Sequence, residues 1–210
     1  MLLNIERNLK EMGRGLKSFP WDNKIAYAWF LSQTYYYVCH STKLLHVAVG
    51  RMKQSDSEYS KRFSQHLREE NGHETIALKD LKRLGFDIKD FPELPETRMF
   101  WETQYYKIEH NDPLSLLGYI YALEAIACEL CPIIKKELDK HYASDCHTFI
   151  KVHGEDDPEH VEKALEQIRR LPKERLRWVQ ENFEQTTQSY RHFLDAILEA
   201  SRLEMQRDSA

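Results

Sequence analysis

Glycine and proline are scarce in this chain, and their scarcity constrains its fold more than any other feature. The 210 residues include seven of each. The stretch from Lys24 to Met52 holds only Gly50, and neither residue type occurs after Pro172. Sheets need frequent turns, which these residues usually form, and no segment combines strand alternation with turn dipeptides. The sequence therefore predicts an all-α protein of long helices.

The expected helices follow from apolar periodicity and from residues that start or stop helices. Asp22 or Asn23, Thr97, and Asn111-Asp112-Pro113 are the expected helix starts. Gly72 falls inside an expected helix, where it costs about 1 kcal/mol relative to Ala. No segment resembles a domain linker, so residues 1–210 are expected to form one domain. The expected helices cover 3–16, 24–52, 57–84, 98–110, 113–141, 144–153, 159–170 and 173–206.

Composition and charge exclude several classes of protein. Hydrophobic residues make up 41% of the chain, enough for a sizeable core. The 30 basic and 34 acidic residues nearly cancel, which leaves no electrostatic footprint for nucleic acid. No apolar stretch of about 18–20 residues predicts a membrane span, and no signal peptide is evident. We therefore expect a cytoplasmic protein with four free thiols, at Cys39, Cys128, Cys131 and Cys146.

The strongest local signal for function lies in the expected helix 57–84. His66, Glu70 and His73 are spaced i, i+4 and i+7, so a continuous helix would present them on one face. A Glu-x-x-His pair lets one helix offer a carboxylate and an imidazole to a metal, as in di-iron carboxylate proteins. The alternative interpretation is a solvated polar face of the helix.

A second triplet repeats this spacing near residue 155. His153, Asp157 and His160 share one face if the segment is helical. Mixed imidazole and carboxylate ligands suit non-haem iron. The alternative is a polar turn in which Asp157 caps a helix that begins at Pro158.

A single carboxylate, Glu124, stands in an otherwise apolar helical stretch from Gly118 to Ala127. Burying a carboxylate is costly unless it is paired or bound to a metal. Glu124 is therefore a third candidate ligand, and a salt bridge to a core Arg or Lys is the alternative.

Together these residues resemble the haem-oxygenase-like superfamily, and specifically its di-iron oxidase branch. The resemblance covers roughly residues 20–200. It implies a bundle of about seven helices whose di-iron members activate dioxygen to oxidise small organic substrates. The motifs behind it are the Tyr-rich helix from Trp29 to Leu45, Glu70-x2-His73 followed by Asp80-Leu81-x2-Leu84-Gly85, Glu124, and His153-x3-Asp157-x2-His160. The ligands it implies are Glu70, His73, Glu124, His153, Asp157 and His160.

The chain departs from that family at one ligand. Members usually carry a further carboxylate, on the first long helix or shortly before the second-helix histidine. Here the first long helix offers His40 but no acid, and His66 stands one turn before Glu70. Either His66 or His40 replaces the carboxylate, or one iron site is weak or absent. Metal-free branches, which include thiaminase II and the last enzyme of pyrroloquinoline-quinone synthesis, remain an alternative, as does a non-catalytic helical interaction protein.

The resemblance implies two iron ions, dioxygen and a small organic substrate. Tyr36, Tyr37 or Tyr121 is expected to shape the substrate pocket or donate a proton. Haem is a poor fit, because it needs a proximal His near the start of the first helix, where the sequence has Arg7, Asn8 and Lys10. Bundles with long helices often dimerise, so a homodimer is expected.

Overall fold

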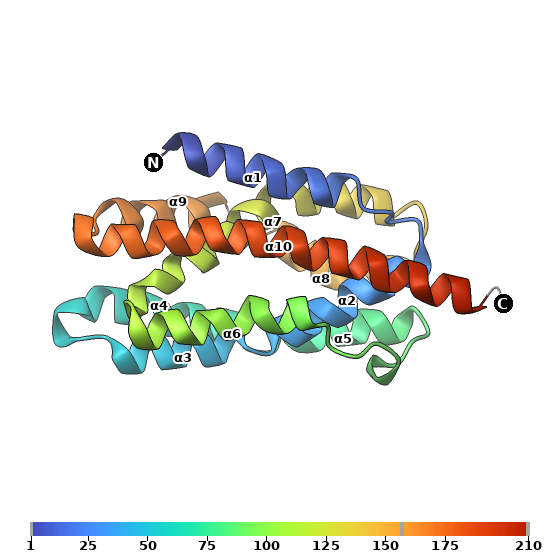
Figure 1. The fold of residues 1–210 in the computed structure, drawn as a ribbon, viewed down its shortest axis with the longest axis horizontal. Helices are drawn as coiled ribbons and strands as arrows, with labels where there is room; N and C mark the ends of the chain where they lie inside the picture. The colour runs from blue at the N-terminus through green and yellow to red at the C-terminus, as the bar shows by residue number, and fades with distance from the viewer. Residues whose placement is uncertain (1, 156–157, 209–210) are drawn as a thin grey trace.

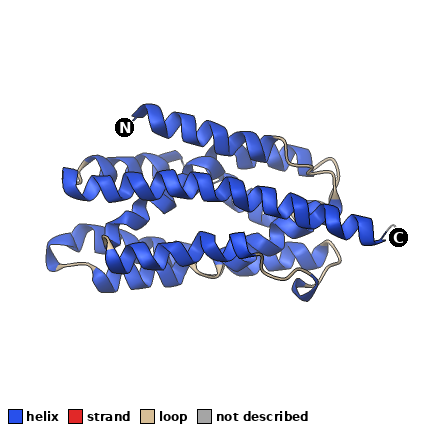
Figure 2. Cartoon of the chain, viewed as in Figure 1, coloured by secondary structure: helices blue, strands red, loops and turns tan. Residues whose placement is uncertain are grey.

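The computed structural model describes residues 2–155 and 158–208, and these residues form α-helices and short 3-10 helices without a strand (Figure 2). The all-α prediction is therefore confirmed. The α-helices are α1 (Leu2–Lys17), α2 (Lys24–Val38), α3 (Ser41–Arg51), α4 (Ser57–Glu70), α5 (His73–Arg83), α6 (Pro95–His110), α7 (Leu116–Leu138), α8 (Thr148–Glu155), α9 (Pro158–Arg169) and α10 (Lys173–Asp208). The 3-10 helices are η1 (Gln54–Asp56), η2 (Ile88–Asp90), η3 (Pro113–Ser115) and η4 (Ser144–Cys146).

The helices form two groups, which lie one above the other in Figure 1. In the upper group, α1 packs against α7 and α10, and α7 packs against α8, α9 and α10. In the lower group, α3 packs against α4 and α6. Helix α2 packs against α5 and α6 and also against α10, while α5 contacts α8 and α3 contacts α7. Any site between α4, α5, α7 and α8 therefore lies between the two groups.

Two of the three predicted helix starts are correct. Asn23 caps α2, and its side chain accepts hydrogen bonds from the backbone N–H groups of Ile25 and Ala26, both at 3.0 Å. Asp112 accepts from the N–H of Leu114 at 2.8 Å, just before Pro113 begins η3. The prediction for Thr97 is wrong, because α6 already begins at Pro95. The Thr97 hydroxyl instead donates to the buried Gln33 Oε1 at 2.7 Å.

The expected helix 24–52 is divided between Val38 and Ser41. The His40 N–H bonds to the carbonyl of Tyr37, three residues back, which tightens the turn and ends α2. The His40 ring stacks on Trp101 at a centroid distance of 3.6 Å, and its Nδ1 lies 2.9 Å from the Tyr105 hydroxyl. Contacts with α6 thus accompany a break that local periodicity could not predict.

The expected helix 57–84 is divided at Asn71 and Gly72. Asn71 is extended, and Gly72 has a φ of +95°. Glycine reaches this left-handed conformation at little cost, so Gly72 is a break and not an interior helix residue. These two divisions turn the eight helices expected from apolar periodicity into the ten α-helices of the described chain.

A close crossing of α7 and α10 holds the upper group together. A Cβ atom on Gly118 would lie 2.2 Å from the carbonyl oxygen of Val179 and 2.7 Å from the nitrogen of Phe183. Only glycine allows the two backbones to approach this closely. The crossing fixes α7 against α10, and α7 carries Glu124.

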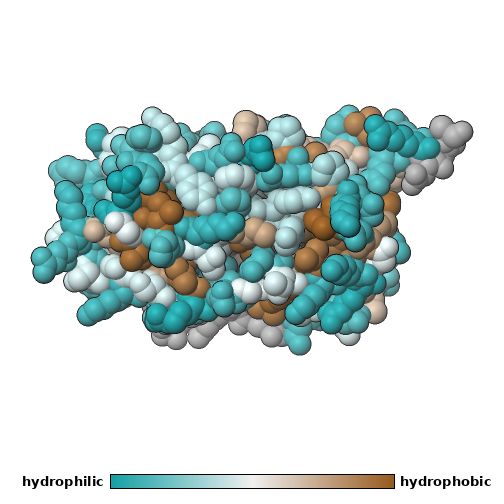
Figure 3. Space-filling model, turned by 90° about the horizontal axis from the view of Figure 1, so that it is seen from below, coloured by the Kyte–Doolittle hydropathy of each residue, from teal (hydrophilic) through white to brown (hydrophobic). Residues whose placement is uncertain are grey.

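The apolar residues are concentrated in the interior, and Figure 3 shows a face covered mostly by hydrophilic side chains with separate hydrophobic patches. One helical stretch in the described chain, Pro113–Leu138, is long and apolar enough to cross a membrane by length and composition. The prediction that no stretch is so apolar was therefore wrong. Half of its most apolar window is buried in the fold, as in the core helix of a bundle.

Candidate metal centre

The Glu70–His73 pair lies at the break between two helices, not on one continuous helix face. Glu70 is the last residue of α4 and His73 is the first residue of α5. The expectation of a shared helix face was wrong in this respect, because Asn71 and Gly72 leave the helical conformation. The turn nevertheless brings His73 Nδ1 to 3.6 Å from Glu70 Oε2. Both side chains therefore reach one point by a turn instead of by helical periodicity.

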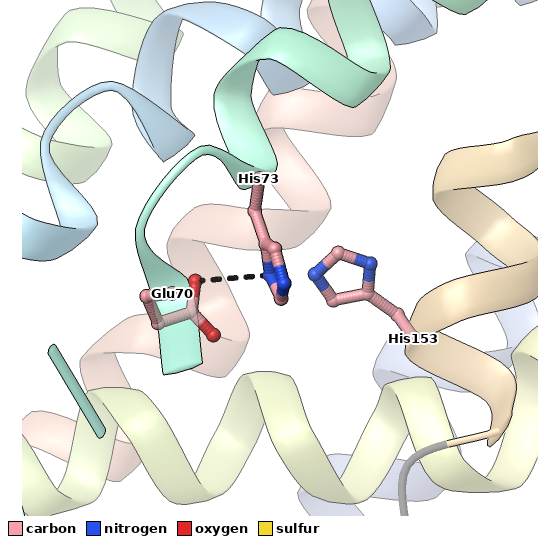
Figure 4. A group of neighbouring side chains, drawn as sticks. All are labelled: Glu70, His73 and His153. Atoms are coloured by element: carbon pink, nitrogen blue, oxygen red, sulfur yellow. Dashed lines mark ion pairs between the residues drawn. The ribbon is translucent and has the colours of Figure 1, made fainter. Parts of the chain in front are cut away.

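A first group of ligand-type side chains consists of Glu70, His73 and His153. One ligand atom of each lies within 4.8 Å of the others. His153 comes from α8, and Figure 4 shows its ring turned toward His73 and Glu70. The two imidazole rings have centroids 4.9 Å apart. His153 Nδ1 lies 2.8 Å from the carbonyl oxygen of Phe149, which fixes the orientation of the ring.

A second group shares Glu70 and adds His66 and Glu124. His66 Nε2 lies 3.8 Å from Glu70 Oε1 and 3.5 Å from Glu124 Oε1. These side chains are largely buried, with exposed fractions of 12% for His66, 14% for Glu70 and 18% for Glu124. Glu70 therefore presents one oxygen to His66 and the other to His73, between the two groups.

The Nδ1 atom of His66, on the far side of the ring from Glu70 and Glu124, contacts a third carboxylate. His66 Nδ1 lies 3.4 Å from Glu69 Oε2. Glu69 is itself fixed by Arg62 at 3.0 Å and by the amide of Gln65 at 2.8 Å. A carboxylate behind an imidazole sets the orientation of the ring and raises its basicity as a ligand. His66 is therefore oriented with Nε2 toward Glu70 and Glu124.

Helix α8 is positioned by a buried acid on α5. Asp80 Oδ2 accepts a hydrogen bond from the backbone N–H of Phe149 at 2.7 Å, in the first turn of α8. The carbonyl of the same residue, Phe149, bonds His153. Asp80 thus connects the helix that begins with His73 to the helix that carries His153.

Gly154 permits the close approach of α8 to α7. A Cβ on Gly154 would lie 2.9 Å from Cys131 Cβ. Any larger residue would push α8 away from α7, and α7 carries Glu124. The spacing of the two ligand helices therefore depends on this glycine.

The surroundings of Glu70 and His66 favour the protonation states that bind a metal. Burial alone would raise the pKa of Glu70, but hydrogen bonding to His73 and the charges of His66, His73 and His153 outweigh it and lower the pKa. Burial lowers the pKa of His66, against the attraction of Glu70. Metal binding requires an ionised carboxylate and a neutral imidazole, and these shifts favour both.

The ligand atoms lie close enough together to share a metal ion. Donor atoms bound to one ion at about 2.1 Å lie about 3–4 Å from one another. The distances of 3.5–3.8 Å from Glu70 and Glu124 to the two imidazoles fall in this range. Mixed nitrogen and oxygen donors are the set that non-haem iron prefers.

The structure brings together five of the seven side chains that the sequence offered as ligands: His66, Glu70, His73, Glu124 and His153. Asp157 and the side chain of His160 lie outside the described residues. His40 lies in neither group, because it stacks on Trp101 beside α6. Of the two histidines expected to replace the family carboxylate, the geometry therefore favours His66.

A cavity of about 110 Å³ adjoins the group, and its wall includes His66, Glu70, Glu124 and His153. Two of the three tyrosines expected at the substrate pocket, Tyr36 and Tyr121, do not line it. The Tyr36 hydroxyl donates to the Phe91 carbonyl at 3.1 Å, and Tyr121 packs on Phe183. Their catalytic role therefore gains no support from their placement.

Three other tyrosines line the cavity, namely Tyr37, Tyr119 and Tyr190. Tyr37 was among the pocket tyrosines expected from the sequence. Tyr119 was missed, because only the tertiary packing turns it toward the site. The Tyr119 hydroxyl is buried without a hydrogen-bond partner among the described residues, and burial raises its pKa.

Cys39 and Cys146 are free thiols, as expected. Cys128 and Cys131 lie on α7. Cys131 lines the cavity beside the ligand group.

A family described as iron-containing redox enzymes matches residues 28–193 of the chain. No curated protein matches the chain. A domain of unknown function with a haem-oxygenase-like fold from Shewanella denitrificans is 24% identical, with a TM-score of 0.85, and the match covers 98% of this chain and 95% of that one.

Two further solved structures resemble the chain in fold. A TenA homologue from Pseudomonas syringae has a TM-score of 0.78 at 10% identity, over 94% of this chain and 92% of that one. A CadD-like protein of unknown function from Nostoc punctiforme has a TM-score of 0.64 at 13% identity, over 95% and 96%. These likenesses confirm the predicted haem-oxygenase-like fold.

Proposed function

Because this chain belongs to the family of iron-containing redox enzymes, we propose that its ligand group binds two iron ions and activates dioxygen to oxidise a small organic molecule. The observation that carries the proposal is the position of Glu70. Its two oxygens face His73 and His66, so one carboxylate can serve two ions. His73 and His153 would complete one site, and His66 and Glu124 the other.

The protein's own contribution is ligand geometry and exclusion of water. Iron, when bound, supplies open coordination positions at which dioxygen can be reduced. Glu69 orients His66, and the carbonyl of Phe149 orients His153, each through the Nδ1 atom of the ring. The apolar wall of the adjoining cavity keeps the polar cluster out of bulk water, which strengthens every electrostatic contact inside it.

Metal stoichiometry tests the proposal. The protein is loaded anaerobically with ferrous iron, desalted and analysed for bound metal. Two ions per chain are expected in the natural protein. Glu70→Ala should lose both, because both sites share this carboxylate, while His153→Ala should lose one. His46→Ala is the matched control, since His46 is exposed and lies outside both groups.

Oxygen consumption separates the oxidase from a metal-free enzyme of the same fold. The iron-loaded protein should consume dioxygen in an oxygen electrode, and Glu70→Ala should not. A protein that binds no iron would refute the proposal and favour the metal-free alternative. Bound iron that is unchanged in Glu70→Ala would also refute it, because the metal would then be held outside the ligand group.

A further inference from the structure

The cavity beside the ligand group has an apolar wall that extends well beyond the ligand side chains. It runs between helices of both groups, with Tyr37 of α2, Leu44 of α3 and Ile150 of α8 in its wall. We propose that it binds the aliphatic chain of the substrate, with the polar end of the substrate at the ligand group. This identity of the substrate rests on the proposed oxidase, but binding of the chain is a property of the cavity alone.

The charges around the cavity support an uncharged chain. The charged or titratable wall residues, apart from tyrosines and Cys131, are the four that belong to the ligand group: His66, Glu70, Glu124 and His153. No Lys or Arg among the described residues lines it. A charged group bound away from the ligand group would be buried without a counter-ion, which is costly. Only the end of the substrate beside the ligand group can therefore be strongly polar.

The shape of the wall gives the direction of the chain. Along α7 the wall passes from Glu124 through Ala127 and Leu130 to Ile134. The ten steps along the helix from Glu124 to Ile134 span about 15 Å at 1.5 Å per residue. Leu16 of α1 lines the same cavity, and it is nearly fully buried, as are Leu130 and Ile134. The far end is thus walled by aliphatic side chains, which suits a straight alkyl chain.

Binding of straight-chain alcohols from butanol to dodecanol to the metal-free protein tests the proposal, by calorimetry. Affinity should rise about fourfold for each added methylene, since each buries more apolar surface, until the cavity is filled. An amino-alcohol of matched length, with an ammonium at the far end, should bind at least tenfold more weakly. No binding, or equal affinity for the two, would overturn the proposal.

A matched pair of variants assigns the binding to the cavity. Ala127 lines it and Ala125 does not, although both are half-buried on α7. Ala127→Phe should weaken binding of the longest alcohol at least tenfold, while Ala125→Phe should leave it unchanged. If Ala127→Phe fails to fold, Ala127→Leu should shift the tightest-binding alcohol to a shorter chain. Equal effects of the two positions would refute the cavity as the site.

Iron binding is measured separately on the same proteins. A protein that binds the alcohols but cannot be loaded with iron would support this inference and refute the proposed oxidase. A protein that binds iron but none of the alcohols would support the proposed oxidase and refute this inference. The two proposals therefore fail independently.

Discussion

Replacement of Asp80 by Asn should change how the stability of the protein depends on pH. The Asp80 side chain is 0% exposed. Burial raises its pKa from 3.8 to about 6, although the Phe149 N–H, Thr148 and Arg83 oppose the shift. The proton is therefore held more tightly in the folded state than in the unfolded state. Ionising this carboxyl at neutral pH costs stability.

The size of the effect follows from the shift. One pKa unit corresponds to about 1.4 kcal/mol, so the rise to about 6 amounts to about 3 kcal/mol. Below the unfolded pKa both states carry the proton and the cost is absent. As pH rises from 3.8 to about 6, the folded state keeps a proton that the unfolded state has lost, so stability falls. Above pH 6 the cost stays constant.

Urea unfolding of the natural protein and Asp80→Asn across this pH range measures the effect. The free energy of unfolding of the natural protein, minus that of the variant, should fall by about 3 kcal/mol between pH 4 and 6 and then level off. Subtraction removes the contributions of other titrating groups. A difference that stays constant with pH would show that Asp80 ionises normally, and the reasoning would be refuted.

Asp80→Ala is the companion variant. It leaves the Phe149 N–H without its acceptor and should cost about 1–3 kcal/mol.

Two other substitutions test the close crossing of α7 and α10 and the contact of Glu69 with His66. Gly118→Ala should destabilise the protein by about 3 kcal/mol in urea unfolding, because the new Cβ meets backbone atoms. Gly50→Ala is its control, since no atom lies within 4 Å of the added Cβ, and it should stabilise slightly. Glu69→Gln should weaken iron binding about tenfold without loss of stability, because it weakens the orientation of His66. Unchanged iron affinity would show that Glu69 does not position His66.

Much of the fold was predictable because helix formation has local causes. The scarcity of Gly and Pro, the cap at Asn23 and the stop before Gly85 are read within a few residues of one another. The types of side chain at the candidate site were also predictable, since Glu124 stands alone in an apolar helix. The predicted cap at Thr97 failed because a tertiary hydrogen bond to Gln33 occupies its hydroxyl.

The sequence by itself determined that this protein is helical and which imidazoles and carboxylates it could offer to a metal. Only the tertiary structure decided that His66, and not His40, joins them, and that Tyr37 lines the cavity while Tyr36 faces Phe91. Helical periodicity fixes the face of a residue but not which other helix that face meets. Non-local contacts, such as that of Gly154 with Cys131, set the meeting point of the helices.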